Sequence, residues 1–303
     1  LHVGEAMRKH GHEIRYFDER WDPEPDMDWP DVVGISSMTG YQLKGSIRYM
    51  KLAKKHGKKT IFGGIHPTSV PEQCIIEDYV DVVVKSEGEV AMLEALEAPV
   101  NTIVDRKMLK TEDMVSPVSD HTIHYFEKSA ESGDTILLTS RGCPFRCAFC
   151  YIQQFFERTW QSVDLDEWKA DIIRLRDTVG MDKLEHGDDW PGKMSRILDL
   201  VRFLWDNGIE YRPSIRAHQI KDELVHEIHK KAGGNCTQNF YAYTALPGSP
   251  LYDLVDKSKL PTTMEEWSDY SLHQTYDKRA SNLYHIGGLR FHSGKGDKTD
   301  RNF

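Results

Sequence analysis

The sequence lacks any uninterrupted apolar run close to the about 20 residues that a membrane-spanning helix needs, and its mean hydropathy is −0.57. It also lacks an excess of positive charge, because 39 Lys and Arg stand against 48 Asp and Glu, for a formal net charge of −9. A surface of that balance cannot neutralise many phosphates. These absences exclude a transmembrane segment and argue against a nucleic-acid partner.

Cysteine is scarce, and its distribution argues against two common uses. The sequence holds five cysteines, of which Cys143, Cys147 and Cys150 lie in one short segment. Three clustered cysteines cannot all pair in disulfides, which are typical of secreted chains. A zinc site usually uses two C-x-x-C pairs or added histidines, and the sequence has no second pair. We therefore expect a cytoplasmic protein.

The N-terminus has neither an initiator methionine nor the pattern of a signal peptide. It opens with LHVGEAMRKHGHE, which is typical of a helix that starts at once. We expect that the first strand of the domain is missing from the sequence.

Residues 1–98 alternate strand-like and helix-like segments, a pattern typical of a parallel α/β sheet. The run DVVGIS at residues 31–36 is continuously apolar and suits a strand buried on both faces. The other expected elements are helices at residues 4–10, 44–55 and 89–97 and strands at residues 12–17, 60–62 and 80–84. Such sheets bind ligands at the loops after their strands, here residues 34–40, 63–72 and 85–89.

These three loops carry groups suited to ligand binding. Ser36, Ser37 and Thr39 offer hydroxyls to amide or phosphate groups, and the pair Gly63 and Gly64 lets the backbone approach a ligand closely. Turns are often rich in glycine and serine, so it is the combination of loops that favours a binding site.

Periodicity fades over residues 99–133, which we interpret as a linker with a short strand at residues 100–104. A second series follows, with strands at residues 135–140, 183–185, 210–216 and 239–244 and helices at residues 164–179, 193–207 and 222–231. Repeated βα units predict a partial TIM-like barrel over residues 134–250. The junction GGNCTQ at residues 233–238 is too short for further βα units, which need crossovers of about a dozen residues. We expect barrel units to be missing there, and residues 251–303 to form a short helical C-terminal region.

The three clustered cysteines follow the spacing C-x-x-x-C-x-x-C within RGCPFRCAFC, after the strand-like TILLTS. Thiolates at Cys143, Cys147 and Cys150 can hold three corners of a 4Fe–4S cluster. Without a fourth cysteine nearby, one iron is left open to another ligand. These three residues are the predicted metal ligands.

Other candidate side chains end the strands of the second series. Asp188 and Asp189 could orient hydroxyls or take up a proton, and a capping or salt-bridged pair is the alternative. Arg216 ends the next strand and could pair with a ligand carboxylate. Tyr241 and Tyr243 share one strand face; Tyr243 is a candidate for proton or hydrogen-atom transfer, with core packing as the alternative.

The run RGCPFRCAFC resembles the signature of the radical S-adenosylmethionine (SAM) enzymes. The resemblance implies that SAM binds the open iron through its amino and carboxylate groups and that Phe149 packs beside the SAM adenine. Arg216 would then pair with a carboxylate of SAM or of the substrate.

Residues 1–98 resemble the cobalamin-binding domain of cobalamin-dependent radical SAM enzymes, through HGHE, PDVVGISSMT, GGIHPTSVPE and SEGE. The resemblance implies a Rossmann-like domain that binds cobalamin at the three loops. The residues implied are Ser36, Ser37, Met38, Thr39, Gly63, Gly64, His66, Pro67, Glu87 and Gly88. Other cobalamin domains supply a cobalt-ligating histidine from D-x-H-x-x-G, which is absent here. His66 therefore either holds its loop or contacts the cofactor elsewhere, and residues 38–42 are candidates to cover the lower face of the cobalt.

Both resemblances together imply an enzyme with a 4Fe–4S cluster, SAM and cobalamin. The most common chemistry of that family is methylation of an unactivated carbon through a 5′-deoxyadenosyl radical and methylcobalamin. Relatives of the same architecture form or rearrange rings without methyl transfer, and a cobalamin-binding sensor or electron carrier is a further alternative. We expect a flavodoxin- or ferredoxin-type electron donor and a small-molecule, lipid or tetrapyrrole-type substrate.

Overall fold

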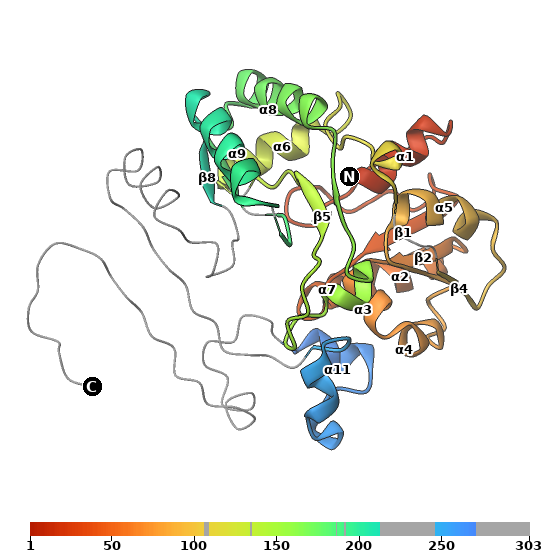
Figure 1. Cartoon of the computed structure of the whole chain (residues 1–303). Coiled ribbons are helices and arrows are strands. Elements are labelled where there is room, and N and C mark those ends of the chain that lie inside the picture. The colour runs from red at the N-terminus through yellow and green to blue at the C-terminus, as the bar shows by residue number, and fades with distance from the viewer. Residues whose placement is uncertain (106–108, 134, 186, 191, 213–245, 271–303) are drawn as a thin grey trace, which may run out of the picture.

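A computed structural model describes residues 1–105, 109–133, 135–185, 187–190, 192–212 and 246–270 (Figure 1). The first part of the described chain is built on a sheet of four parallel strands in the order β1-β2-β3-β4. The strands are β1 (Val32–Ser36), β2 (Lys59–Gly63), β3 (Val82–Lys85) and β4 (Thr102–Asp105). They confirm the strands predicted at residues 31–36, 60–62, 80–84 and 100–104, with small shifts at their ends.

Helices cover both faces of this sheet, which explains why its strands are apolar throughout. On one face, α2 (Gln42–Lys55) packs in a core with β2, β3 and the short helix α4 (Pro71–Ile75). On the other face, α5 (Gly88–Glu97) packs against β2, β3 and β4, and α1 (His2–Lys9) packs against α5. The short helix α3 (Ile65–Ser69) follows β2 directly. The predicted helices of this part are confirmed.

The strand predicted at residues 12–17 is wrong, because this segment forms no ladder with β1. Its carbonyl groups bind side chains instead: Arg8 Nη2 donates to the Ile14 carbonyl at 2.8 Å, and the Tyr125 hydroxyl to the Tyr16 carbonyl at 2.9 Å. Phe17 packs edge-on against Tyr49. A strand needs a neighbour for its backbone groups, whereas an alternating pattern records only which side chains are buried.

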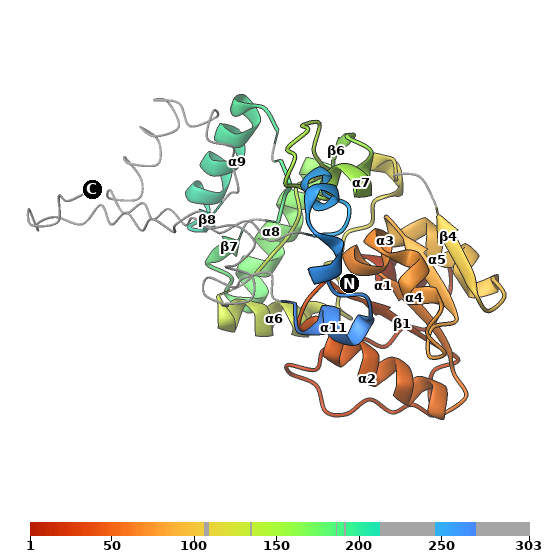
Figure 2. The same ribbon diagram turned by 90° about the horizontal axis from the view of Figure 1, so that it is seen from below.

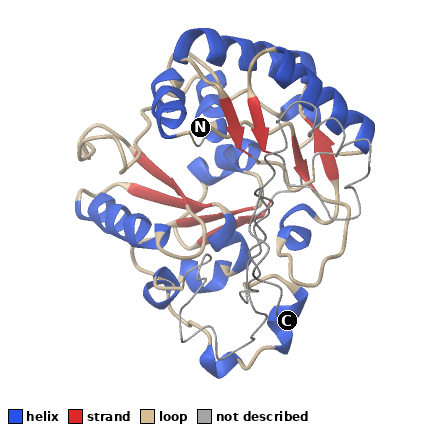
Figure 3. Ribbon diagram, turned by 90° about the vertical axis from the view of Figure 1, so that its left-hand side faces the viewer, coloured by secondary structure: helices blue, strands red, loops and turns tan. Residues whose placement is uncertain are grey.

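The second part of the described chain has its own core and its own strands, which Figure 3 shows as a separate group. Its elements are η1 (Thr111–Asp113), α6 (Ile123–Ser132), β5 (Ser140–Gly142), α7 (Ile152–Phe156), β6 (Trp160–Ser162), α8 (Leu165–Val179), β7 (Lys183–Glu185), α9 (Met194–Asp206) and β8 (Glu210–Arg212). β7 and β8 pair in parallel and enclose α9 as a βα unit. The elements predicted at residues 222–231 and 239–244 lie outside the described residues.

The strand predicted at residues 135–140 is largely wrong. Only Ile136 forms a parallel bridge, with Glu185, and the regular strand β5 lies further along and pairs antiparallel with β6. The Asp188 carboxylate accepts the backbone N–H groups of Thr139 and Ser140 at 2.8 Å each. Those two donors are therefore not available to a neighbouring strand.

The predicted helical C-terminal region contains η3 (Pro250–Leu254), η4 (Lys257–Lys259) and α11 (Met264–Ser268). A capping box starts α11: Thr263 Oγ1 accepts the Glu266 N–H at 3.2 Å, and Glu266 Oε2 accepts the Thr263 N–H at 3.3 Å. Figure 2 shows α11 beside α2, and Met264 and Trp267 belong to the core of the first part. The C-terminal region thus completes a core that begins some 200 positions earlier in the sequence.

Candidate functional site

The loops that follow β1, β2 and β3 meet at one edge of the sheet; we refer to residues 37–41, 64–69 and 86–88 as the strand-end loops. Ser37 N–H donates to the Gly63 carbonyl at 3.1 Å, and His66 N–H donates to the Ser37 carbonyl at 3.1 Å. Ser86 N–H donates to Thr68 Oγ1 at 2.9 Å. These bonds bring together the loop residues that the sequence predicted as a binding site.

Gly64 is where two of these loops come closest. Its φ of +98° favours glycine, and a Cβ at this position would lie 2.8 Å from Ser36 Oγ and from the backbone N and O of Ser37. A side chain would therefore push the two loops apart, so the glycine is required by the packing of the loops themselves.

His66 belongs to the second strand-end loop, and its side chain is fully buried. Its Nδ1 is 3.1 Å from Thr39 Oγ1, and its ring stands edge-on to Trp267 with centroids 6.0 Å apart. Burial lowers the pKa of His66 to about 4, so the imidazole is neutral at pH 7. Within the described part of the chain Nε2 has no hydrogen-bond partner. The contact with Thr39 fits the alternative in which His66 holds its loop.

Glu87 and Gly88 are placed differently from the other predicted loop residues. The Glu87 carboxylate is buried and accepts the Leu109 N–H at 2.7 Å and Arg141 Nη1 at 2.8 Å. A Cβ on Gly88 would lie 2.8 Å from the Val3 side chain of α1. Both residues thus join the loop after β3 to other parts of the chain, and sequence reasoning missed Arg141 as a partner.

The cysteine loop, residues 143–151, connects β5 to α7. Its three cysteines are thiols, each partly exposed, and Cys150 N–H donates to the Cys147 carbonyl at 3.0 Å. Burial is the main cause that raises the pKa of the Cys150 thiol above its ordinary value. The loop therefore gathers three thiols in one region.

Three thiols form a donor set that fits an iron–sulfur cluster with one open corner. Among the described residues no three His, Cys, Asp or Glu side chains converge as ligands of a single metal ion.

The two aspartates after β7 hold the backbone that leads into the cysteine loop. Besides the N–H groups of Thr139 and Ser140, the buried Asp188 accepts the Thr139 hydroxyl at 2.5 Å. Asp189 Oδ2 accepts the Gly142 N–H at 3.3 Å. Burial raises the pKa of both carboxyls, that of Asp189 to about 6. These contacts favour the structural alternative for Asp188, while Asp189 faces the cysteine loop.

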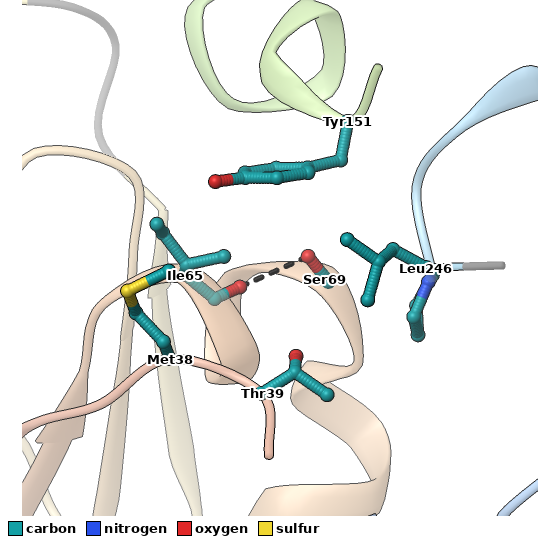
Figure 4. Close-up of a pocket in the computed structure, with 7 residues that line it drawn as sticks. Met38, Thr39, Ile65, Ser69, Tyr151 and Leu246 are labelled. Atoms are coloured by element: carbon teal, nitrogen blue, oxygen red, sulfur yellow. Dashed lines mark hydrogen bonds between the residues drawn. The ribbon is translucent and has the colours of Figure 1, made fainter. Parts of the chain in front are cut away.

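A small pocket with a cavity volume of about 10 Å³ lies between the strand-end loops and the cysteine loop (Figure 4). It is lined by Met38, Thr39, Ile65, Ser69, Tyr151, Leu246 and Pro247. Figure 4 shows the Tyr151 ring on one side and Ile65, Ser69 and Thr39 opposite it. That volume has room for about one water molecule, far less than the about 300–1,000 Å³ of most ligand sites, but the lining brings the two predicted cofactor regions face to face. The sequence predicted Met38 and Thr39 individually and placed Ile65 and Ser69 within the expected binding loop at residues 63–72, whereas nothing in its pattern marked Tyr151.

Phe149 is not among the residues that line the pocket. Phe149 is on the cysteine loop with 60% of its surface exposed, so it is open to a ligand. Arg216 and Tyr243 lie outside the described residues.

Comparison with known proteins identifies the first part of the chain. Residues 1–96 match the family model of the B12 binding domain. An uncharacterized methyltransferase of Pyrococcus horikoshii is 24% identical over 245 residues, which cover 72% of this chain and 52% of that protein. An uncharacterized methyltransferase of Synechocystis is 33% identical over 138 residues, 45% of this chain and 25% of that protein. The bacteriochlorophyllide d C-12(1)-methyltransferase of Chlorobaculum tepidum is 20% identical over 232 residues, 73% of this chain and 50% of that protein.

The chain spans about half the length of these relatives or less. The parallel sheet with helices on both faces is consistent with a Rossmann-like B12-binding domain. All three relatives are named methyltransferases. Among the described residues, no helix has the length and apolar character that crossing a bilayer requires.

Proposed function

We propose that this chain acts as a cobalamin-dependent radical SAM methyltransferase that methylates an unactivated carbon. The observation that carries the proposal is the pocket shared by the strand-end loops of the B12-binding domain and the cysteine loop. Tyr151, the residue after Cys150, lines it from one side, and Met38 and Thr39 line it from the other.

The proposal assigns separate tasks to the two regions. When bound, the cluster would supply the electron that cleaves SAM to a deoxyadenosyl radical, and cobalamin would carry the methyl group. Cys143, Cys147 and Cys150 would hold the cluster from one loop. The glycines and hydroxyl groups of the strand-end loops would hold cobalamin, because small residues let the cofactor approach the backbone closely.

The pocket lining suits radical chemistry. Met38, Ile65, Leu246 and Pro247 present apolar surface, and the Tyr151 ring closes the opposite side. An apolar lining keeps water away from reactive species, which limits side reactions. Ser69 Oγ donates to the Ile65 carbonyl at 2.9 Å, so this hydroxyl has a partner within its own helix.

The proposal is tested by anaerobic reconstitution of the chain with iron and sulfide, followed by incubation with SAM, a reductant and hydroxocobalamin. Mass spectrometry should detect both 5′-deoxyadenosine and S-adenosylhomocysteine, because the radical reaction yields the first and methyl donation by SAM yields the second. Deoxyadenosine without S-adenosylhomocysteine would instead favour the non-methylating, ring-forming type. Neither product, from protein with intact iron and cobalt, would refute the enzymatic proposal.

Two cysteine variants give a matched comparison. Cys147→Ala removes one predicted cluster ligand and should abolish deoxyadenosine formation together with most of the bound iron. Cys74→Ala removes a fully buried thiol of the first part, far from the cysteine loop in the sequence, and should retain both. Equal iron content in the two variants would contradict the assignment of Cys147 as a ligand.

A further inference from the structure

A buried ion triad joins the B12-binding domain to the strand that leads into the cysteine loop. Arg141 of β5 donates through Nη1 to Glu87 Oε1 at 2.8 Å and through Nη2 to Glu89 Oε1 at 2.5 Å. The exposed fractions of Arg141, Glu87 and Glu89 are 7%, 4% and 3%. One guanidinium thus binds two carboxylates across the boundary between the two parts, shielded from water.

The electrostatics of the triad make its geometry specific. Burial works against the charged form of Arg141, but both carboxylates outweigh it and raise the pKa of the guanidinium. Burial also opposes ionisation of Glu89, yet Arg141 holds the pKa of this carboxyl below its ordinary value. Buried ion pairs add little net stability, because desolvation of the charges offsets their attraction. The two directional contacts of Arg141 tie β5 to the loop after β3 and to the start of α5.

Hydrogen bonds continue from the triad toward the strand-end loops. Thr68 Oγ1 donates to the Gly64 carbonyl at 2.7 Å and accepts the Ser86 N–H at 2.9 Å. Ser86 has a φ of +62°, a left-handed conformation rarely adopted by a residue with a side chain, and Glu87 follows it directly. These contacts therefore connect Gly64, through Thr68 and residues 86–87, to Arg141.

On the other side, the triad leads directly into the cysteine loop. Gly142 separates Arg141 from Cys143, and its φ is +80°. A Cβ on Gly142 would lie 2.3 Å from the Thr159 carbonyl oxygen, so this backbone has little room to shift. The triad therefore sits two residues from Cys143, joined to it by a tightly packed backbone.

From this arrangement we propose that Arg141 is a positioning residue, which couples cobalamin binding at the strand-end loops to the conformation of the cysteine loop. The inference rests on the proposed function, because it takes those loops as the cobalamin site. Coupling of this kind is a free energy between two sites and acts in both directions. Occupation of the B12-binding domain would thus hold the three thiols in their arrangement.

The test follows the thiols themselves in the iron-free chain. Alkylation of Cys143, Cys147 and Cys150 by iodoacetamide is followed for each cysteine by mass spectrometry, without and with saturating hydroxocobalamin. Saturation is verified from the visible spectrum, so that weaker binding does not imitate a loss of coupling. In the native chain, cobalamin should slow alkylation at least about fivefold, the lower end of common coupling factors.

In Arg141→Met the effect of cobalamin on alkylation should disappear. Arg141→Lys keeps the positive charge but lacks the planar fork that contacts both carboxylates, so only part of the effect should remain. Where Arg141→Met does not fold, as judged by circular dichroism, Glu89→Gln takes its place with the same expectation, because it weakens one arm of the triad.

Lys54→Met is the matched control. Lys54 Nζ binds the buried Asp81 carboxylate at 2.7 Å, just before β3, at the sheet edge opposite the strand-end loops. This variant also removes the cation of an ion pair, yet it should keep the full effect of cobalamin on the cysteines. Loss of the effect in Lys54→Met would show that general destabilisation is responsible, and would overturn the inference.

Two further results would overturn it. Protection that persists unchanged in Arg141→Met would mean that the cofactor shields the thiols directly, and an absence of protection in the native chain would mean that no coupling exists. The proposed function fails separately. Protection that depends on Arg141, in a chain that forms no deoxyadenosine after reconstitution, would refute the enzymatic proposal and leave the coupling in place.

Discussion

Trp267 joins the C-terminal helix α11 to the B12-binding domain, and its replacement by alanine would measure that contact. The side chain is fully buried, its ring lies 6.0 Å from that of His66 and 5.0 Å from that of Tyr270, and Nε1 donates to Gln73 Oε1 at 3.1 Å. Truncation of a buried tryptophan removes its transfer free energy and leaves a cavity, together about 3–5 kcal/mol. Loss of the hydrogen bond adds about 1 kcal/mol.

Urea unfolding followed by circular dichroism, combined with amide hydrogen exchange, tests this magnitude. Trp267→Ala should lower the free energy of unfolding of the first part by about 4–6 kcal/mol. Exchange of the most protected amides of α2 and β2 should then accelerate about a hundredfold or more, since each 1.4 kcal/mol is tenfold. Amides of α9, which belongs to the other core, should keep their rates.

Trp205→Ala is the control for this substitution. Trp205 lies on α9, and 37% of its surface is exposed to solvent. Its truncation should therefore cost about 1 kcal/mol or less. A loss below about 1 kcal/mol in Trp267→Ala as well, with unchanged exchange in α2, would refute the reasoning. It would mean that α11 contributes nothing to the core in solution.

Two further predictions concern single positions. The variant Gly142→Ala should bind much less iron after reconstitution, because φ is +80° and the new Cβ would clash with the Thr159 carbonyl. The control Gly180→Ala, with φ of +69° and open space around it, should lose only about 1–2 kcal/mol of stability and keep its iron. Equal iron in the two variants would argue against the clash. For His66, burial lowers the pKa to about 4, below the about 6.5 of an unfolded histidine. On acidification this histidine is therefore protonated in the unfolded chain while it is still neutral in the folded chain. His66 should therefore contribute a fall in unfolding free energy of about 1.4 kcal/mol per pH unit between pH 6.5 and 4. His2, whose pKa burial also lowers to about 4, adds a slope of its own in both variants, so an unchanged total slope in His66→Gln would assign the effect to other groups.

Local patterns were sufficient for the elements whose burial is set by neighbours close in sequence. The apolar run at residues 31–36 predicted β1, and the βα alternation predicted the parallel sheet and the edge at which its loops gather. The pattern failed at residues 12–17 and 135–140, where a strand requires a partner for its backbone. In those segments side chains such as Arg8 and Asp188 bind the backbone groups instead. The hydrophobic pattern of a sequence does not show whether a side chain or a neighbouring strand will bind them.

The sequence by itself determined which candidate ligand residues this protein has and how they are spaced. The spacing of Cys143, Cys147 and Cys150 and the glycine-rich loops predict a cluster site and a cobalamin site, because ligand chemistry depends on residue types at short separation. Tertiary structure alone decided how the two sites are connected. The triad of Arg141, Glu87 and Glu89 joins residues more than 50 positions apart, and Trp267 packs on a domain that ends long before it. Such contacts depend on how entire helices and strands pack against each other, and no local sequence pattern encodes that packing.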